Sequence, residues 1–309
     1  MRSLVCFLMG VLPLLLARAP VIPIVGRWDI TIEGKDGKYP SWVEFSQGAG
    51  GLKGRFVGRT GAVHNLRDVR FNGGELTFVV PKEEEELPHD LTFRGTLANA
   101  RIHGVTTSGG MRAAWDAVRA PSLMRNEAPV WGSEESLFNG RDLSGWKPLP
   151  VSGRNMWRAK NGELVNAASG ANLVTDRVFS DFKLHLEFKV PQGSDSGVYL
   201  RGRYEIEIAD AYGNPPDSHG FGSIYGFLKP ASNPARRGGD WQAIDATLIG
   251  RKVTVAVNGI ETIHNAEIPG VTGGAIDSDE GKPGPLLLQG DHGAVSYRNI
   301  LVTRAAGGE

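Results

Sequence analysis

Short segments of alternating apolar and polar residues, separated by glycine-rich breaks, fill almost the whole chain. Early breaks include Gly34 to Gly37, Gly48 to Gly51, Asn72 to Gly74 and Ser108 to Gly110. Period-two alternation is the pattern of half-buried strands, and glycine-rich breaks favour turns between them. Glycine accounts for 42 of the 309 residues, and no alanine- or leucine-rich helical stretch follows the N-terminus. The pattern predicts an all-β protein.

The first part of the chain, residues 24–120, is expected to form a small antiparallel domain. An up-and-down meander of short strands can close into a barrel, whose interior is more often filled by side chains than by a ligand. The aromatic residues expected inside are Trp28, Trp42, Phe56, Phe78, Phe93 and Trp115. The expected strands are Gly26–Glu33, Trp42–Gln47, Leu52–Arg59, Val63–Phe71, Glu75–Val80, Asp90–Thr96, Arg101–Thr106 and Arg112–Arg119.

The second part, residues 136–305, follows a proline-containing linker at residues 121–135. About eleven strands are expected here, and two layered antiparallel sheets would bury so many half-apolar strands. Asn258-Gly259 lies between two of them and fits a tight primed hairpin turn. The expected fold is therefore a jelly-roll β-sandwich preceded by a smaller barrel-like domain.

The first nineteen residues have the features of a secretory signal peptide. Arg2 precedes the apolar run Leu4 to Leu16, and Ala17 and Ala19 supply the small residues of a cleavage site. We therefore expect an exported protein, periplasmic or extracellular, or membrane-anchored if the segment is retained. The single cysteine, Cys6, lies inside this segment, so no disulfide is expected in the mature chain. No integral membrane segment is expected there either.

One segment carries closely spaced acidic residues. Alternation between Arg203 and Ala209 places Tyr204, Ile206 and Ile208 on one face and Glu205 and Glu207 on the other, which we expect to be open. Two carboxylates at this spacing lie roughly 6–7 Å apart at the backbone, near the separations of about 5–9.5 Å used by glycosidases. A β-bulge would bring Asp210 to the same face. The competing interpretation is a solvated row of ion pairs with Arg201 and Arg203.

Other side chains near this strand suit a sugar ligand. Aromatic faces stack on sugar rings, and planar polar groups pair with hydroxyls. The candidates for substrate binding are Arg201, Glu207, Tyr225, Lys229, Trp241 and Gln289. His292 stands beside Asp291 and is a candidate for proton transfer near neutral pH. The candidate catalytic residues are Glu205, Asp210 and His292.

Charge and motif content exclude several other classes of function. The formal net charge is zero, which argues against nucleic acid as a partner. No histidine pair has metal-ligand spacing, and no phosphate-binding or dinucleotide motif is present. No cofactor is expected, although loop carboxylates such as Asp277 and Asp279 could hold calcium. The sequence does not indicate the oligomeric state.

Several short motifs are spread through the second part of the chain. They are Ser136-Leu137-Phe138-Asn139-Gly140, Leu143-Ser144-Gly145-Trp146, Phe179 to Leu184, Ser196 to Arg201, Tyr204 to Ile208, Gly239 to Gln242, Asn258-Gly259, Leu288 to Gly293 and Tyr297 to Ile300. With these motifs, the chain from Leu137 to Thr303 resembles the 3-keto-disaccharide hydrolase domain family, which has the concanavalin A-like lectin/glucanase fold. The family commonly has Gln where this chain has Glu207, so the resemblance shifts the catalytic assignment to Glu205, Asp210 and His292.

The resemblance implies cleavage of glycosides whose glucose unit is oxidised at C3. A C3 ketone acidifies the C2 proton, so the C1 substituent can leave by elimination; this requires a base, an acid and oxyanion stabilisation. His292 or Glu205 could be base or acid in either order, with Arg201 or Lys229 at the oxyanion. The alternatives are an ordinary glycosidase with paired carboxylates and a non-catalytic glycan-binding module.

Overall fold

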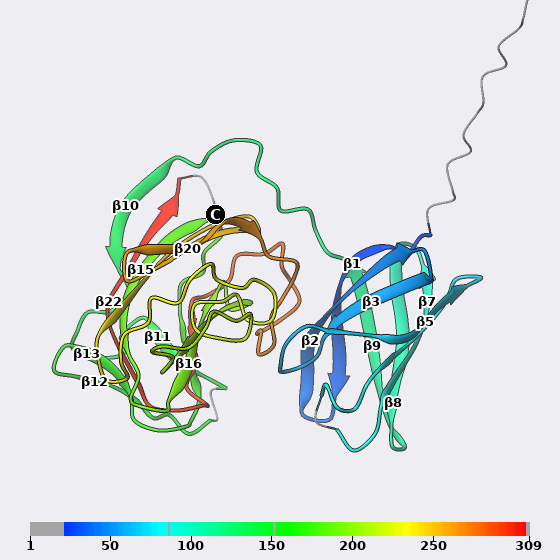
Figure 1. Cartoon of the computed structure of the whole chain (residues 1–309), viewed down its shortest axis with the longest axis horizontal. Helices are drawn as coiled ribbons and strands as arrows, with labels where there is room; N and C mark the ends of the chain where they lie inside the picture. The colour runs from blue at the N-terminus through cyan, green and yellow to red at the C-terminus, as the bar shows by residue number, and fades with distance from the viewer. Residues whose placement is uncertain (1–21, 86, 151–152, 307–309) are drawn as a thin grey trace, which may run out of the picture.

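A computed structural model of the protein describes residues 22–306 except 86, 151 and 152, and every regular element in this part is a β-strand. The strands form two domains that lie side by side (Figure 1). The expected signal segment Met1–Ala19, with Cys6, falls outside the described residues. Among those residues, no helix is long and apolar enough to cross a membrane.

The first domain is one antiparallel sheet curled into a nearly closed barrel. Its strand order is β4-β3-β2-β1-β9-β8-β7-β6-β5. The first and last strands of the domain, β1 and β9, therefore pair with each other in the middle of the sheet. The expected strand Val63–Phe71 is divided at Leu66, because β4 pairs with β3 and β5 pairs with β6. Within β5, Asp68 has a positive φ of 51° where the register shifts between Arg67 and Arg70. The strands are β1 (Gly26–Gly34), β2 (Gly37–Gly48), β3 (Gly51–Val57), β4 (His64–Asn65), β5 (Arg67–Asn72), β6 (Glu75–Val80), β7 (Leu91–Ala98), β8 (Arg101–Ser108) and β9 (Met111–Arg119).

Five of the six expected aromatic residues lie inside the barrel, where Phe78 and Phe93 stack at 4.5 Å between ring centroids. Trp42 is the exception. Because side chains alternate along β2, Val43 and Phe45 point inwards and Trp42 points outwards. It is nevertheless fully buried, since the second domain covers it.

The second domain is a sandwich of two antiparallel sheets, as the sequence predicted. One sheet has the order β12-β13-β22-β15-β18-β19-β20, with β10 paired to β22, and the other has the order β11-β14-β21-β16-β17. A single apolar core fills the space between them. The strands are β10 (Trp131–Ser136), β11 (Trp146–Leu149), β12 (Trp157–Lys160), β13 (Glu163–Asn166), β14 (Asn172–Thr175), β15 (Phe182–Lys189), β16 (Asp195–Leu200), β17 (Tyr204–Ala209), β18 (Gln242–Ile249), β19 (Lys252–Val257), β20 (Ile260–Glu267), β21 (Leu287–Leu288) and β22 (Val295–Ala305).

The turn expected at Asn258-Gly259 is present between β19 and β20. Asn258 and Gly259 both have positive φ, 52° and 79°, as a type I′ hairpin turn requires.

The expected linker at residues 121–135 is shorter than predicted, because residues 131–135 belong to β10. This strand pairs with β22 at the edge of the larger sheet. Its charged composition concealed it, since an edge strand needs little apolar surface.

The two domains meet in a packed interface. The indole of Trp42 lies edge-on to Phe227, 5.3 Å between ring centroids, and Val57, Val271 and Ala275 complete the apolar cluster. Polar contacts extend the interface, including Thr31 Oγ1 to Ser278 Oγ at 2.5 Å. The two domains are therefore packed against each other and are not joined by the linker alone.

Candidate active site

A cavity of about 260 Å³ opens beside β17 at the boundary with the first domain. Four carboxylic acids and two histidines line it: Asp195, Glu205, Glu207, His219, Asp291 and His292. Tyr199, Tyr225, Asn172 and Gln289 add uncharged polar groups. The cavity therefore holds hydroxyl, amide, imidazole and carboxyl groups, the set that binds a sugar and moves protons.

Strand β17 positions both glutamates. Tyr204, Ile206 and Ile208 point into the core, while Glu205 and Glu207 face the cavity on the opposite side. The expected open face is in fact covered: Glu205 is only 4% exposed. Thr60 and Gly61 of the first domain, with Gly273 and Gly274, lie around the cavity on this face. The segment after Gly222 extends the edge of the sheet, with hydrogen bonds from Tyr225 N–H to Glu205 C=O and from Glu207 N–H to Ser223 C=O.

Burial changes the protonation of both glutamates. Loss of hydration raises the pKa of Glu205 to about 8, although interaction with Tyr199 and with His292 opposes the rise. Burial and the neighbouring Glu205 also raise the pKa of Glu207. Both carboxyls therefore carry a proton at neutral pH, which makes them hydrogen-bond donors as well as acceptors.

His292 lies in the loop after β21. Asn166 Nδ2 donates to the carbonyl oxygens of Gly290 and Gly293, and Asn172 Oδ1 accepts from Gly290 N–H. These contacts hold the loop against the sandwich. The imidazole Nδ1 lies 3.0 Å from Asp291 Oδ1, and this hydrogen bond raises the pKa of His292 above its usual value.

Neutral hydrogen-bonding groups occupy the rest of the cavity wall. The Tyr199 hydroxyl donates to Gly273 C=O at 3.1 Å and lies 3.5 Å from the amide nitrogen of Gln289. Burial, together with the nearby Glu205 carboxyl, raises the pKa of Tyr199, so the phenol stays protonated. Tyr225, with its pKa also raised by burial, lies on the segment that pairs with the edge of β17.

The first domain supplies one wall of the cavity, through Thr60 and Gly61 in the turn between β3 and β4. The turn is held by a hydrogen bond from Gly274 N–H to Arg59 C=O at 3.0 Å. The fit is close: a Cβ atom on Gly273 would lie 2.4 Å from Gly61 O. No sequence pattern pointed to this contribution, because Thr60 and Gly61 read as ordinary turn residues.

Five of the expected site residues meet in the cavity: Glu205, Glu207, Tyr225, Gln289 and His292. The other four do not line it. The cavity thus brings together the acidic strand and the histidine loop, which are more than eighty residues apart in the chain.

Asp210, Arg201, Lys229 and Trp241 have other surroundings. The Asp210 carboxylate accepts hydrogen bonds from the backbone N–H groups of Gly193 and Gly238. Arg201 is buried and donates to Gly250 C=O and to the Tyr204 hydroxyl. Lys229 is exposed, and the Trp241 ring packs under the cations of Lys189 and Arg298. No bulge returns Asp210 to the face of Glu205.

The acidic residues considered for calcium are engaged elsewhere. Asp277 binds the guanidinium of Arg203 through two oxygens, at 2.7 and 3.0 Å, and Asp279 pairs with Lys282. In the part of the chain that the structure describes, no group of three or more His, Cys, Asp or Glu residues is placed to hold a metal ion.

The raised pKa of Glu207 predicts a pH-dependent stability. A carboxyl whose pKa is raised by folding stabilises the protein below its unfolded pKa, and this contribution is lost as the pH rises through the folded value. Burial raises the pKa of Glu207 to about 10, so pH 5 to pH 8 lies between the unfolded and folded values. Over this range the unfolding free energy of Glu207→Gln should rise relative to that of wild type by up to about 4 kcal/mol. Urea unfolding at both pH values measures this. Glu261→Gln, at an exposed glutamate, is the control. Unfolding free energies of wild type and Glu207→Gln that change in parallel with pH would contradict the prediction.

One family of sequences and several solved structures are similar to this chain. The sequence profile described as a 3-keto-alpha-glucoside-1,2-lyase-like domain matches residues 133–303, a little over half of the chain. No curated protein matches the chain. Two crystal structures of proposed glycosyl hydrolases from Parabacteroides distasonis ATCC 8503 are similar. One is 26% identical with a TM-score of 0.48 and covers 58% of this chain and 92% of its own. The other is 18% identical with a TM-score of 0.46 and covers 55% and 93%.

Proposed function

Because the chain belongs to the 3-keto-alpha-glucoside-1,2-lyase-like domain family, we propose that it cleaves glycosides whose glucose unit carries a ketone at C3. The observation that carries the proposal is the meeting of Glu205 and His292 in one sugar-sized cavity of the family domain. The expected signal segment adds that the reaction takes place outside the cytoplasm.

The proposed reaction begins at C2 of the keto-sugar. The C3 ketone makes the C2 proton acidic, and a base removes it to leave an enediolate with its negative charge on O3. The electron pair then forms a C1–C2 double bond as the C1–O bond breaks, and the departing oxygen takes a proton. One base and one acid are therefore needed, as well as donors for the charge on O3.

Geometry and protonation together assign the two principal roles. His292 acts as the base in its neutral form, in which Nδ1–H donates to Asp291 and Nε2 accepts the C2 proton. Because Asp291 raises the pKa of His292, this neutral form, and with it cleavage, should increase as the pH rises through that pKa. Glu205 is the acid, because burial keeps it protonated at neutral pH. Arg201 and Lys229, considered for the oxyanion, do not line the cavity. Gln289 and protonated Glu207 are the donors that replace them in this proposal.

The decisive assay compares a 3-keto-glucoside with its unoxidised parent. The purified protein is incubated with each, and the released alcohol and the sugar product are analysed. The proposal expects product from the keto-sugar alone. Release from the parent as well would favour an ordinary glycosidase using Glu205 and Glu207, which face the same cavity from one strand. Binding of sugar without product from either would indicate a glycan-binding module.

The wall donated by the first domain should limit substrate size. Gly273→Ala places a methyl group against Gly61 and pushes the β3–β4 turn outwards. We expect KM for a 3-keto-glucoside to rise by about tenfold, as the turn loses contact with substrate. Gly281→Ala is the matched control, since its Cβ would have no atom closer than 3.6 Å. An unchanged KM in Gly273→Ala would show that the turn does not contact substrate.

A further inference from the structure

The barrel of the first domain has a pocket of its own at one end, with a volume of about 720 Å³. This differs from the completely filled interior expected from the sequence. The aromatic core fills the other part of the barrel, whereas the pocket opens between the β1–β2 turn, the loop before β7 and the β8–β9 hairpin. Its volume lies within the range of about 300–1,000 Å³ that holds a small organic molecule.

The inner walls of this barrel pocket are apolar. Ile32, Phe56, Leu91 and Phe93 line it, and Leu87 and Met111 stand at its opening. Met111 is 64% exposed, so an apolar side chain borders the entrance without burying itself. Ile32, Phe56 and Phe93 are already buried, so a ligand with an apolar body would gain the free energy of removing Leu87, Leu91 and Met111 from water.

Two polar side chains in the wall lack partners. Glu85 Oε1 and Thr106 Oγ1 are buried without a hydrogen bond among the described residues. The Glu85 side chain is 9% exposed and Thr106 is 4% exposed. His64 lies 3.8 Å from Glu85, but burial lowers the pKa of His64, so the ring is neutral rather than a counter-ion. Leaving such groups unpaired is unfavourable, and a ligand hydroxyl would satisfy them.

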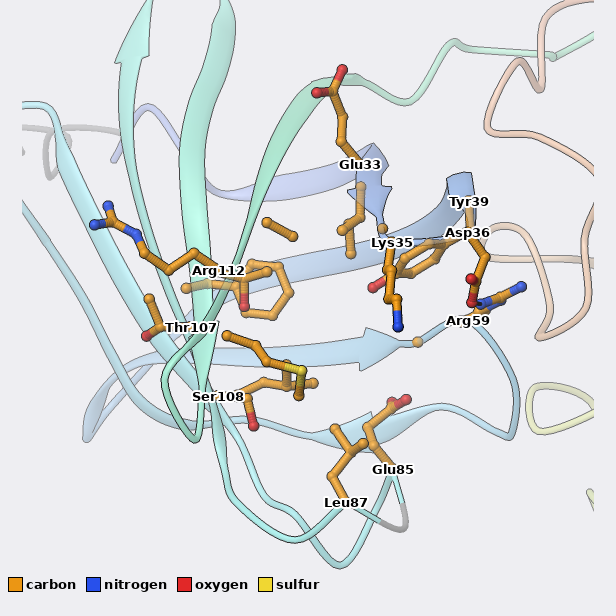
Figure 2. A pocket seen from close by; sticks show the side chains of 18 of the residues that line it. Glu33, Lys35, Asp36, Tyr39, Arg59, Glu85, Leu87, Thr107, Ser108 and Arg112 are labelled. Carbon is orange, nitrogen blue, oxygen red and sulfur yellow. Dashed lines mark ion pairs between the residues drawn. The ribbon is translucent and has the colours of Figure 1, made fainter.

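Charges around the opening disfavour an ionic ligand. Lys35 and Glu85 reach into the opening from different sides, while Glu33 and Arg112 point away from it (Figure 2). Arg59 lies near Asp36, at 3.9 Å, and over the ring of Tyr39. A carboxylate ligand would be repelled by ionised Glu85, and an amine would be repelled by Lys35. Burial raises the pKa of Glu85 to about 7, so this partly neutral carboxyl attracts an amine only weakly. A neutral molecule avoids both repulsions.

We propose that the barrel pocket binds an uncharged amphipathic molecule, an aromatic or aliphatic body that carries one hydroxyl, such as an alkylphenol. The apolar body lies against Leu87, Leu91 and Met111, above the packed pair Phe56 and Phe93, and the hydroxyl donates to Glu85. This binding site is separate from the sugar cavity, although Thr60 lines both. The proposal does not depend on the reaction assigned to that cavity.

The test uses the full chain and the neutral fluorophore N-phenyl-1-naphthylamine, displaced by para-butylphenol or by its methyl ether. Ala113→Phe fills the pocket from β9, and Ala114→Phe, the next residue on the opposite face, is the matched control. We expect saturable binding in wild type and Ala114→Phe, and at least about a tenfold loss in Ala113→Phe. The phenol should displace the fluorophore about tenfold better than its ether, and Glu85→Gln should reduce that preference.

Three results would overturn the proposal. They are no saturable binding to wild type, equal affinity in the two phenylalanine variants, and equal displacement by phenol and ether. Stronger displacement by butyrate or butylamine would also overturn it, because the pocket would then select a charge. If circular dichroism shows that Ala113→Phe does not fold, the comparison of phenol and ether still tests the proposal. The proposal then requires that the phenol displaces the fluorophore better than the ether in wild type, and that Glu85→Gln reduces this preference.

Discussion

Glu205→Gln is expected to lower cleavage of a 3-keto-glucoside with a poor leaving group by about 10²–10⁴-fold, the usual contribution of a general acid. The variant keeps the shape of the side chain but cannot deliver the proton that the departing oxygen needs. Removal of the C2 proton should persist, since His292 remains. The loss should therefore shrink when the leaving group is a nitrophenol, which departs without a proton.

His292→Ala should behave differently. Without the base, both C2 exchange with solvent deuterium and cleavage should fall by a similar factor, whatever the leaving group. His264→Ala is the control, because His264 is an exposed histidine that pairs with Glu261 much as His292 pairs with Asp291. If both Glu205→Gln and His292→Ala turn over the keto-sugar at the wild-type rate, neither residue is catalytic.

Trp42→Ala is expected to cost about 3–5 kcal/mol of unfolding free energy, the range for removing a buried tryptophan. The indole is fully buried at the domain boundary and contacts Phe227, so its loss leaves a cavity in the interface. Urea unfolding followed by circular dichroism gives the change. Activity should fall as well, because the turn at Thr60 and Gly61 depends on the docked position of the barrel.

A second tryptophan provides the comparison. Trp131 lies on the edge strand β10, where it is partly exposed under Lys183. Trp131→Ala should cost less than about 1.5 kcal/mol, since it removes little buried area. Equal losses in the two variants would show that the interface contributes no more than an edge-strand contact.

Much of the fold could be predicted from the sequence, because period-two alternation and turn residues are local properties. The sandwich core and the Asn258-Gly259 turn were predicted for that reason. Trp42 was expected inside the barrel but lies in the interface between the domains, because a large apolar side chain suits either environment. An apolar residue in a domain interface and one in a barrel core look alike in sequence. Only the alternation of β2, which turns Val43 and Phe45 inwards, shows that Trp42 points outwards.

The site was partly predictable. Alternation placed Glu205 and Glu207 on one face, and the resemblance placed His292 near them. Asp210 was expected at the same face through a bulge, but backbone N–H groups of two glycines hold its carboxylate elsewhere. The contribution of Thr60 and Gly61 could not be predicted, since contacts between domains leave no local pattern.

The most direct measurement of the central claim is cleavage of a 3-keto-glucoside that carries deuterium at C2. If His292 removes the C2 proton before the C1–O bond breaks, the deuterated substrate should react more slowly and lose its label to water. Reaction at the same rate, with the deuterium retained in the sugar product, would contradict the account and indicate direct attack at C1.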